Sequence, residues 1–130
     1  MGNEILRHLN CESTDLIGKD TLKKLLALLQ AASVLLTPDS GPAHMAACVD
    51  TPVIGLYAAS NPARSGPYKS QQWCVNAYPL AARLYLKKDS ARLRWGRKIE
   101  TPGVMDLIKP VDVLEKLDLL AATLGLEKIA

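Results

Sequence analysis

The sequence predicts an α/β fold with a parallel sheet, and three observations support that prediction. Two short apolar runs rich in β-branched residues, 33–37 and 53–57, have the composition of buried parallel strands. The segment between them carries a helix signature, and this strand–helix–strand order implies a right-handed parallel crossover. The hydrophobic fraction of 48% and the charged fraction of 22% are typical of a globular protein. At 130 residues, the chain has the length of one such domain, residues 1–130.

The segment ahead of the first strand is expected to hold two helices and one very short strand. Residues 3–9 resemble the tail of a helix, and residues 15–18 are a candidate strand. Residues 21–32 form a clearer helix, which Asp20 or Thr21 can cap. The predicted apolar stripe of that helix is Leu22, Leu25, Leu26 and Leu29.

Two further helices are expected downstream. The first runs from Pro42 to about Val49 and ends before Asp50-Thr51-Pro52. The second spans 111–124, and Gly125 is a plausible stop. Its predicted apolar face is Val111, Leu114, Leu117, Ala121 and Leu124.

The turn after the first strand, Thr37-Pro38-Asp39-Ser40-Gly41-Pro42, is the most informative stretch of the chain. Gly41 stands where the turn is expected to need freedom in φ, and Pro42 suits the first helical position. The backbone N–H groups of Ala43 and His44 would then be unpaired at a helix N-terminus. Such amides, with the helix dipole, favour a phosphate or another anion.

Composition excludes several other classes. The net charge of +3 is too small to indicate a nucleic-acid-binding protein by itself. No apolar run is long enough to span a bilayer. Cys11, Cys48 and Cys74 lack C-x-x-C spacing, so neither a disulfide framework nor a zinc site is predicted. Buried or idle thiols in a reducing cytoplasm are the expected state.

Four segments in the same order resemble glycosyltransferase family 9, whose best-known members are lipopolysaccharide heptosyltransferases. They are Asp15-Leu16-Ile17-Gly18-Lys19, Asp39-Ser40-Gly41-Pro42-x-His44-x-Ala46-Ala47, Thr51-Pro52-Val53-Ile54-Gly55-Leu56-Tyr57 and Asn61-Pro62-x-Arg64-x-Gly66-Pro67-Tyr68. The resemblance covers roughly residues 14–68, and Ile108-Lys109-Pro110-x-x-Val113 adds a weaker match.

This resemblance implies a Rossmann-like three-layer fold, the C-terminal half of a GT-B glycosyltransferase. The chain would then be a fragment that binds a nucleotide-diphospho-sugar, with ADP-heptose as the expected donor, and needs no metal or other cofactor. The acceptor, a lipopolysaccharide core, and the catalytic base of this inverting enzyme would belong to the other domain. No catalytic residue is therefore assigned here, and the fragment alone is expected to be inactive. The complete enzyme would work in the cytoplasm, at the inner face of the inner membrane.

The residues expected to bind the donor are Asp39, Ser40, Gly41, Pro42, Ala43, His44 and Arg64. The resemblance gives His44 a nucleotide-sugar contact, whereas a His satisfied by a neighbouring carbonyl is the structural alternative. Ser40 and Gly41 are explained equally well as a helix cap and as part of an anion cradle. Asp39 is interpreted as a brace for its own turn, or as a contact to ribose or sugar hydroxyls. Arg64 either neutralises the diphosphate or is simply solvated.

Two alternative functions remain open from the residues, and so do two interpretations of the basic segment 83–98. The first alternative is half of a GT-B-like nucleotide-sugar epimerase, an enzyme that also uses an Asp-Ser-Gly turn. The Pro42-x-His44 and Asn61-Pro62 matches argue against this alternative. A non-catalytic nucleotide- or phosphate-binding module would keep the fold without the chemistry. The basic segment 83–98 departs from the family pattern and is interpreted as a surface toward a phosphorylated, membrane-borne acceptor or as the solvated face of a mobile loop. Tyr57 and Tyr68 are expected to pack rather than to stack on a base.

Overall fold

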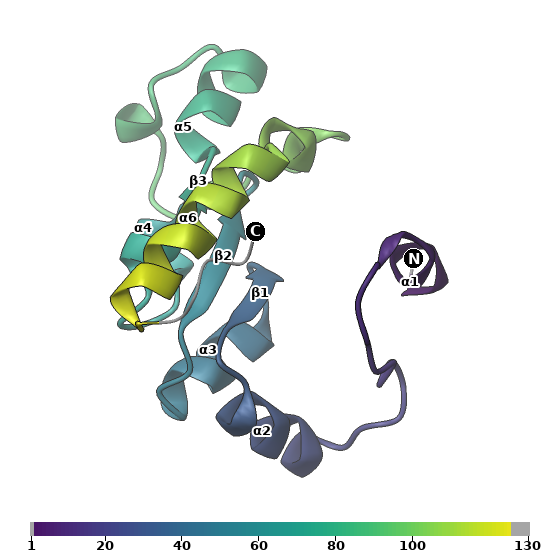
Figure 1. The fold of residues 1–130 in the computed structure, drawn as a ribbon. Coiled ribbons are helices and arrows are strands. Elements are labelled where there is room, and N and C mark those ends of the chain that lie inside the picture. Colours follow the sequence, from purple (N-terminus) through teal and green to yellow (C-terminus); the bar gives the residue numbers. More distant parts are fainter. Residues whose placement is uncertain (1, 126–130) are drawn as a thin grey trace.

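In the computed structural model, which describes residues 2–125, a three-stranded parallel sheet lies between helices (Figure 1). The strands are β1 (Leu35–Pro38), β2 (Val53–Tyr57) and β3 (Val75–Asn76), in the spatial order β1-β2-β3. Leu35 lies opposite Val53 in the first pair, and Leu56 lies opposite Val75 in the second. The predicted α/β class and the parallel pairing of the two apolar runs are confirmed.

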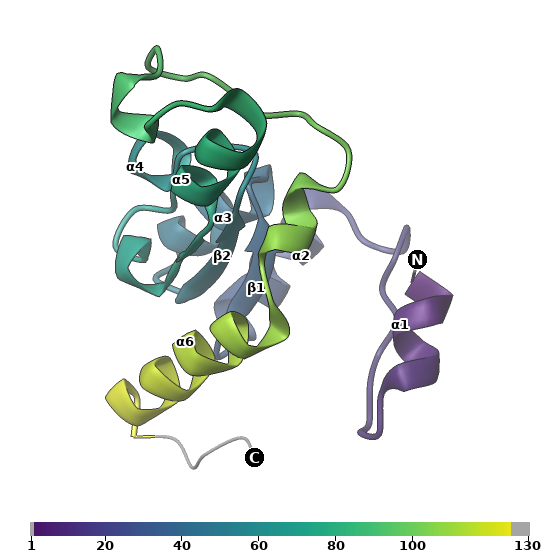
Figure 2. The ribbon, with the colours of Figure 1, turned by 90° about the horizontal axis from the view of Figure 1, so that it is seen from above.

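Helices lie on both faces of this sheet. One face carries α2 (Leu22–Ala31) and α3 (Gly41–Cys48), and the long helix α6 (Pro110–Thr123) crosses the other (Figures 1 and 2). The remaining elements are short apart from α1: α1 (Gly2–His8), α4 (Pro62–Ser65), η1 (Gln71–Trp73), α5 (Tyr78–Ala81), the π-helical turn η2 (Ala82–Leu86), η3 (Ser90–Arg92) and η4 (Val104–Leu107).

The predicted helices and the two strands of the apolar runs are confirmed. β2 has the predicted bounds, and α2 begins after Thr21, whose Oγ1 accepts a hydrogen bond from the Lys24 amide at 3.3 Å. The predicted helix tail at residues 3–9 is α1, and Gly125 follows α6 with a φ of +69°. The short strand β3 was not predicted, because two residues are too few to show a pattern.

The strand predicted at residues 15–18 is wrong. The Asp15 carboxylate accepts a hydrogen bond from the Ile17 amide at 3.0 Å, and the Lys19 amide donates to the Leu16 carbonyl at 3.0 Å. Gly18 has a φ of +70°. Aspartate favours this local side-chain hydrogen bond and glycine tolerates the left-handed region, so the segment forms a turn instead.

The predicted apolar stripes of two helices are wrong in part. On α2, Leu29 is buried, but Leu22 and Leu26 are exposed. On α6, the buried residues are Leu120 and Ala121, whereas Val111, Leu114 and Leu124 are exposed. A sheet of three strands covers only a narrow line along each helix, so much of the apolar pattern faces outward in this chain.

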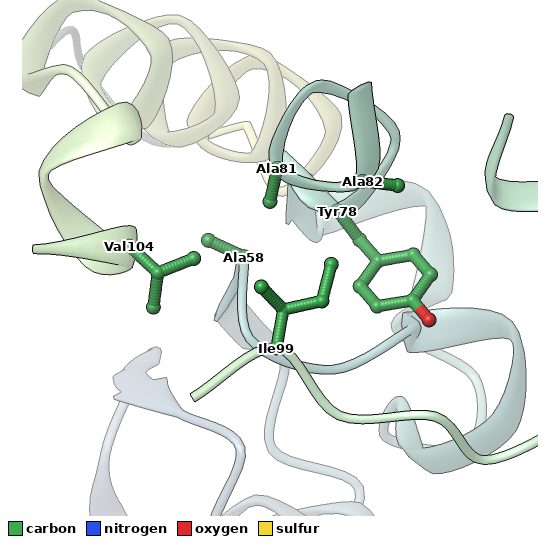
Figure 3. Close-up of a cluster of buried hydrophobic side chains, with 6 residues drawn as sticks. All are labelled: Ala58, Tyr78, Ala81, Ala82, Ile99 and Val104. Atoms are coloured by element: carbon green, nitrogen blue, oxygen red, sulfur yellow. The ribbon is translucent and has the colours of Figure 1, made fainter. Parts of the chain in front are cut away.

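Two separate clusters of buried side chains form the core. The first lies between α2, α3 and the sheet and consists of Leu29, Ala43, Ala46 and Val53. The second packs the segment after β2 against α5 and the chain near residue 100 (Figure 3). It consists of Ala58, Tyr78, Ala81, Ala82, Ile99 and Val104. These clusters hold the loops that follow β1 and β2 in place.

Candidate functional site

The turn between β1 and α3 lies at the carboxyl end of the sheet, where ligands of parallel α/β folds bind. Ser40 is the N-cap residue of α3, but its side chain makes no hydrogen bond to the helix. Its Oγ lies 2.8 Å from Oγ1 of Thr37, a partly buried pair. The Ala43 amide donates to the Ser40 carbonyl at 3.1 Å, so the prediction that this amide is unpaired is wrong. Because the Ser40 side chain makes no hydrogen bond to the helix, the α3 N-terminus is not capped by a side chain.

The predicted need for conformational freedom at Gly41 is wrong. Gly41 is the first residue of α3, and its φ is not positive. A Cβ built on Gly41 would meet no atom within 4 Å. The fold therefore does not require glycine here.

Asp39 joins two loops rather than bracing its own turn. Its Oδ2 accepts hydrogen bonds from Oγ of Ser60 at 2.7 Å and from Oγ of Ser65 at 3.0 Å. The Tyr57 hydroxyl donates to the Ser65 carbonyl at 3.2 Å. Burial, together with the negative charge of Asp39, raises the pKa of Tyr57, so this phenol stays protonated as a donor. The β1–α3 turn is thus tied to the loop that follows β2.

Ser60 and Ser65 were missed by the sequence analysis, although a signal for Ser60 was available. Asp39 follows β1 closely, and Ser60 follows β2 in a similar way. Because parallel strands end at the same edge of a sheet, polar residues after adjacent strands are expected to meet.

His44 is exposed on α3 and lines a shallow hollow of about 380 Å³. The other lining residues are Ala47, Cys48, Asp50, Tyr68 and Lys69. Lys69 and Asp50 form an ion pair at 2.8 Å across it, which lowers the pKa of Asp50. Tyr68 is 77% exposed, so the prediction that it packs is wrong, whereas Tyr57 is fully buried as predicted.

Arg64 belongs to a different hollow. It lies on α4, a short helix capped by Asn61, whose Oδ1 accepts from the Ala63 amide at 3.0 Å. Its side chain reaches Gly96 and lines a recess of about 420 Å³ with residues 94–98 and Glu100. The hollows of His44 and Arg64 share no lining residue. Asp39, through Ser65, lies beside both the α3 turn and the helix that carries Arg64.

The basic segment 83–98 is built into the fold, so its interpretation as a mobile loop is wrong. It begins in η2 and passes through η3, and Leu86 and Leu93 pack on the second core cluster. The Tyr78 hydroxyl donates to the Arg97 carbonyl at 2.7 Å. Its cationic side chains are exposed, but its backbone is held.

Within residues 2–125, no three or more His, Cys, Asp or Glu side chains gather as a metal site would require. No helix in that range has the length and apolar character needed to cross a membrane. Cys11 and Cys48 are exposed, and burial raises the pKa of the Cys74 thiol.

Comparisons with known proteins agree with the motifs of this site. The family model of glycosyltransferase family 9 (heptosyltransferase) matches residues 1–95. The lipopolysaccharide core heptosyltransferase OpsX of Haemophilus influenzae is 41% identical over 101 residues, which are 78% of this chain and 29% of that protein. Lipopolysaccharide heptosyltransferase 2 of Salmonella typhimurium is 40% identical over 65 residues, 47% of this chain and 19% of that protein.

Lipopolysaccharide heptosyltransferase 3 of Escherichia coli K12 is 34% identical over 97 residues, 70% of this chain and 28% of that protein. The chain thus spans less than a third of each of these relatives. No solved structure matches it.

Proposed function

This chain belongs to glycosyltransferase family 9, the heptosyltransferase family, and we propose that it is the nucleotide-sugar-binding part of a lipopolysaccharide core heptosyltransferase. The observation that carries this proposal is the β1–α3 turn. Its helix N-terminus has no side-chain cap, and its Asp39 is fastened to the loop after β2. Such a turn at the carboxyl edge of a parallel sheet suits the diphosphate of a nucleotide-sugar.

The donor we propose is ADP-heptose, and the reaction an inverting transfer to the lipopolysaccharide core. The chain would supply the C-terminal half of a GT-B enzyme, residues 1–130, while the acceptor site and the catalytic base belong to a second domain. The 130-residue chain would then bind the donor without completing a transfer. The reaction would take place at the cytoplasmic face of the inner membrane.

The contribution of this half to catalysis is electrostatic. As the sugar leaves, negative charge builds up on the diphosphate, and fixed donors aimed at that charge lower the barrier. We assign this role to the positive end of the α3 dipole at Gly41, Pro42 and Ala43, and to the side chain of His44. Arg64 can add a guanidinium from the neighbouring helix.

Asp39 has a positioning role in this proposal. A carboxylate beside a diphosphate would repel it, but two serine hydroxyls donate to Asp39 and disperse its charge. The carboxylate thereby holds the α3 turn against the loop that leads to Arg64. Ser40, whose hydroxyl is paired with that of Thr37, shapes the same turn.

Calorimetric titration of ADP and of adenosine into the chain tests this proposal. His44→Ala is expected to weaken ADP binding by about 1–3 kcal/mol, because a hydrogen bond to phosphate is lost. Adenosine, which lacks the diphosphate, is expected to lose less. His8→Ala is the matched control, because His8 is the other histidine of the chain and lies exposed on α1.

Equal losses for ADP and adenosine would remove His44 from the diphosphate site. Absence of ADP binding by the unaltered chain would contradict the donor-binding role itself. A chain that binds ADP, within a longer protein that transfers no heptose, would favour a non-catalytic nucleotide-binding module.

A further inference from the structure

The recess that contains Arg64 gathers cationic side chains from two distant parts of the sequence. Arg64 comes from α4, and Arg94, Arg97 and Lys98 come from the segment that leads to Ile99. Figure 2 shows this segment passing over α4. Glu100 is the single acidic residue in the lining. The recess therefore carries a strong positive charge in a chain whose total net charge is only +3.

Among the described residues, no ion pair neutralises the cationic side chains of this recess. Within residues 2–125, the only ion pair joins Lys69 and Asp50, which lie outside the recess. Over the same range, no side-chain hydrogen bond involves the guanidinium of Arg64, Arg94 or Arg97. Like charges around one hollow repel one another, and a bound anion would relieve that repulsion.

The backbone that carries these charges is fixed, which distinguishes the recess from a solvated loop. The Ile99 amide donates to the Ala59 carbonyl at 2.8 Å, and Ile99 is 2% exposed in the second core cluster (Figure 3). Tyr78, buried in the same cluster, holds the Arg97 carbonyl. The cationic side chains therefore project from an ordered frame, as preorganised binding requires.

Gly96 forms part of the recess wall beside Arg64. Its φ is +82°, and a Cβ built on it would lie 3.0 Å from Nε of Arg64. The glycine thus allows the arginine side chain to lie close against the backbone. The α4 side and the 94–98 side of the recess therefore lie close together at this point.

We propose that this recess binds a phosphorylated small molecule, of the sugar phosphate class, at a site separate from the α3 turn. Several arginines facing one hollow suit the oxygens of a phosphomonoester, because a guanidinium can donate two hydrogen bonds to it. Trp95 lines the same recess and is 69% exposed, so its indole offers an apolar face to a sugar ring. A volume of about 420 Å³ is within the range of small-molecule sites.

Arg64 is the one residue that the recess shares with the proposed donor site, and the inference rests on the other residues of the lining. The recess is lined by α4 and residues 94–100, whereas the amides of the donor site belong to α3. A failure of ADP to bind at the α3 turn would leave the recess unchanged, and the reverse also holds.

Titration of glucose 6-phosphate, followed by calorimetry and by tryptophan fluorescence, tests the inference. Glucose and inorganic phosphate serve as probes of the two halves of the ligand. Arg94→Gln combined with Arg97→Gln is expected to weaken glucose 6-phosphate binding by about tenfold or more, because two charge-assisted contacts are lost. ADP binding is expected to change less than twofold. Trp95→Phe is expected to remove most of the fluorescence response.

Arg83→Gln combined with Lys87→Gln is the matched control. It removes the same number of charges from exposed positions of the same segment that do not line the recess. Circular dichroism of each variant establishes that the fold is kept. Full retention of glucose 6-phosphate affinity in the control supports a built site.

Four results would overturn the inference. They are no binding of glucose 6-phosphate or phosphate by the unaltered chain, equal losses in the control, an equal loss of ADP binding in the recess variant, and binding only to phosphatidylglycerol vesicles. The last two would indicate one shared diphosphate site and a membrane surface, respectively.

Discussion

The β1–α3 turn and the basic recess are the two sites proposed to bind anions, and they differ in the groups that they offer. The turn, residues 39–44, is contiguous and offers backbone amides, with a carboxylate tied to neighbouring serines. The recess offers arginine and lysine side chains assembled from α4 and from residues 94–98. The two regions meet at one place, where Ser65 contacts Asp39 and Arg64, its neighbour, lines the recess.

This difference in how the two sites are assembled determines which of them can be recognised from the sequence. A site made from consecutive residues leaves a motif, whereas a site made from distant side chains leaves only a charge run. One glycine in each region makes the contrast testable. Gly96 has a positive φ and a close neighbour, and Gly41 has neither. Replacing each by alanine should therefore have opposite effects on the fold.

Gly96→Ala is expected to have the largest effect on stability, a loss of about 1–3 kcal/mol. A residue with a Cβ is strained at a φ of +82°, and the new Cβ would crowd Nε of Arg64 at 3.0 Å. Urea denaturation measures the free energy of unfolding. Affinity for glucose 6-phosphate should fall at the same time, since Arg64 is displaced.

Gly103→Ala is the matched control for this experiment. Gly103 also has a positive φ, +81°, and the nearest atom to its Cβ would be Oδ2 of Asp106 at 3.3 Å. Its stability loss should be similar, but glucose 6-phosphate affinity should be retained. Equal loss of affinity in both variants would show that Gly96 acts only through stability.

Asp39→Ala is expected to lower the free energy of unfolding by about 1–2 kcal/mol, which is less than the largest loss expected for Gly96→Ala. The variant removes the acceptor of two hydroxyl hydrogen bonds, which join the turn to the loop that carries Arg64. ADP affinity should fall as well, because the two loops separate. A double-mutant cycle with Ser60→Ala isolates the contact in unfolding experiments. Additive effects in that cycle would contradict a coupling between the two loops.

Much of the fold follows from local sequence, and the parts that do not are those decided by distant contacts. β2 and α2 show strong strand and helix patterns, with Thr21 as the cap, and both were predicted. The buried face of α6 was not, since it depends on which strands lie beneath the helix. A two-residue strand such as β3 forms because β2 offers a partner, not because of its own pattern.

The candidate site divides in the same way. The position of the turn at the carboxyl end of the sheet was predictable, because the apolar run, the glycine and the proline follow one another closely along the chain. The bond from Asp39 to Ser60 joins residues that are 21 positions apart, and the interpretation of Asp39 as a local brace missed it. The basic segment was noticed as a charge run, but its backbone anchors, Tyr78 and Ala59, are visible only in the structure.

Gly41→Ala is expected to have the smallest effect on stability. It therefore best distinguishes an effect on ligand binding from an effect on the fold. Alanine suits a helical φ and restricts the unfolded chain, so stability should be unchanged or rise by about 0.4–1 kcal/mol. The added Cβ would meet no protein atom within 4 Å, which means that only a ligand could be obstructed. If a diphosphate approaches the α3 backbone there, ADP affinity should fall and Gly41→Val should lower it further. Glucose 6-phosphate binding should not change, because the recess lies on other elements. Unchanged ADP affinity in both Gly41 variants would show that the diphosphate does not lie against this residue, and the recess would then become the stronger anion site of the two.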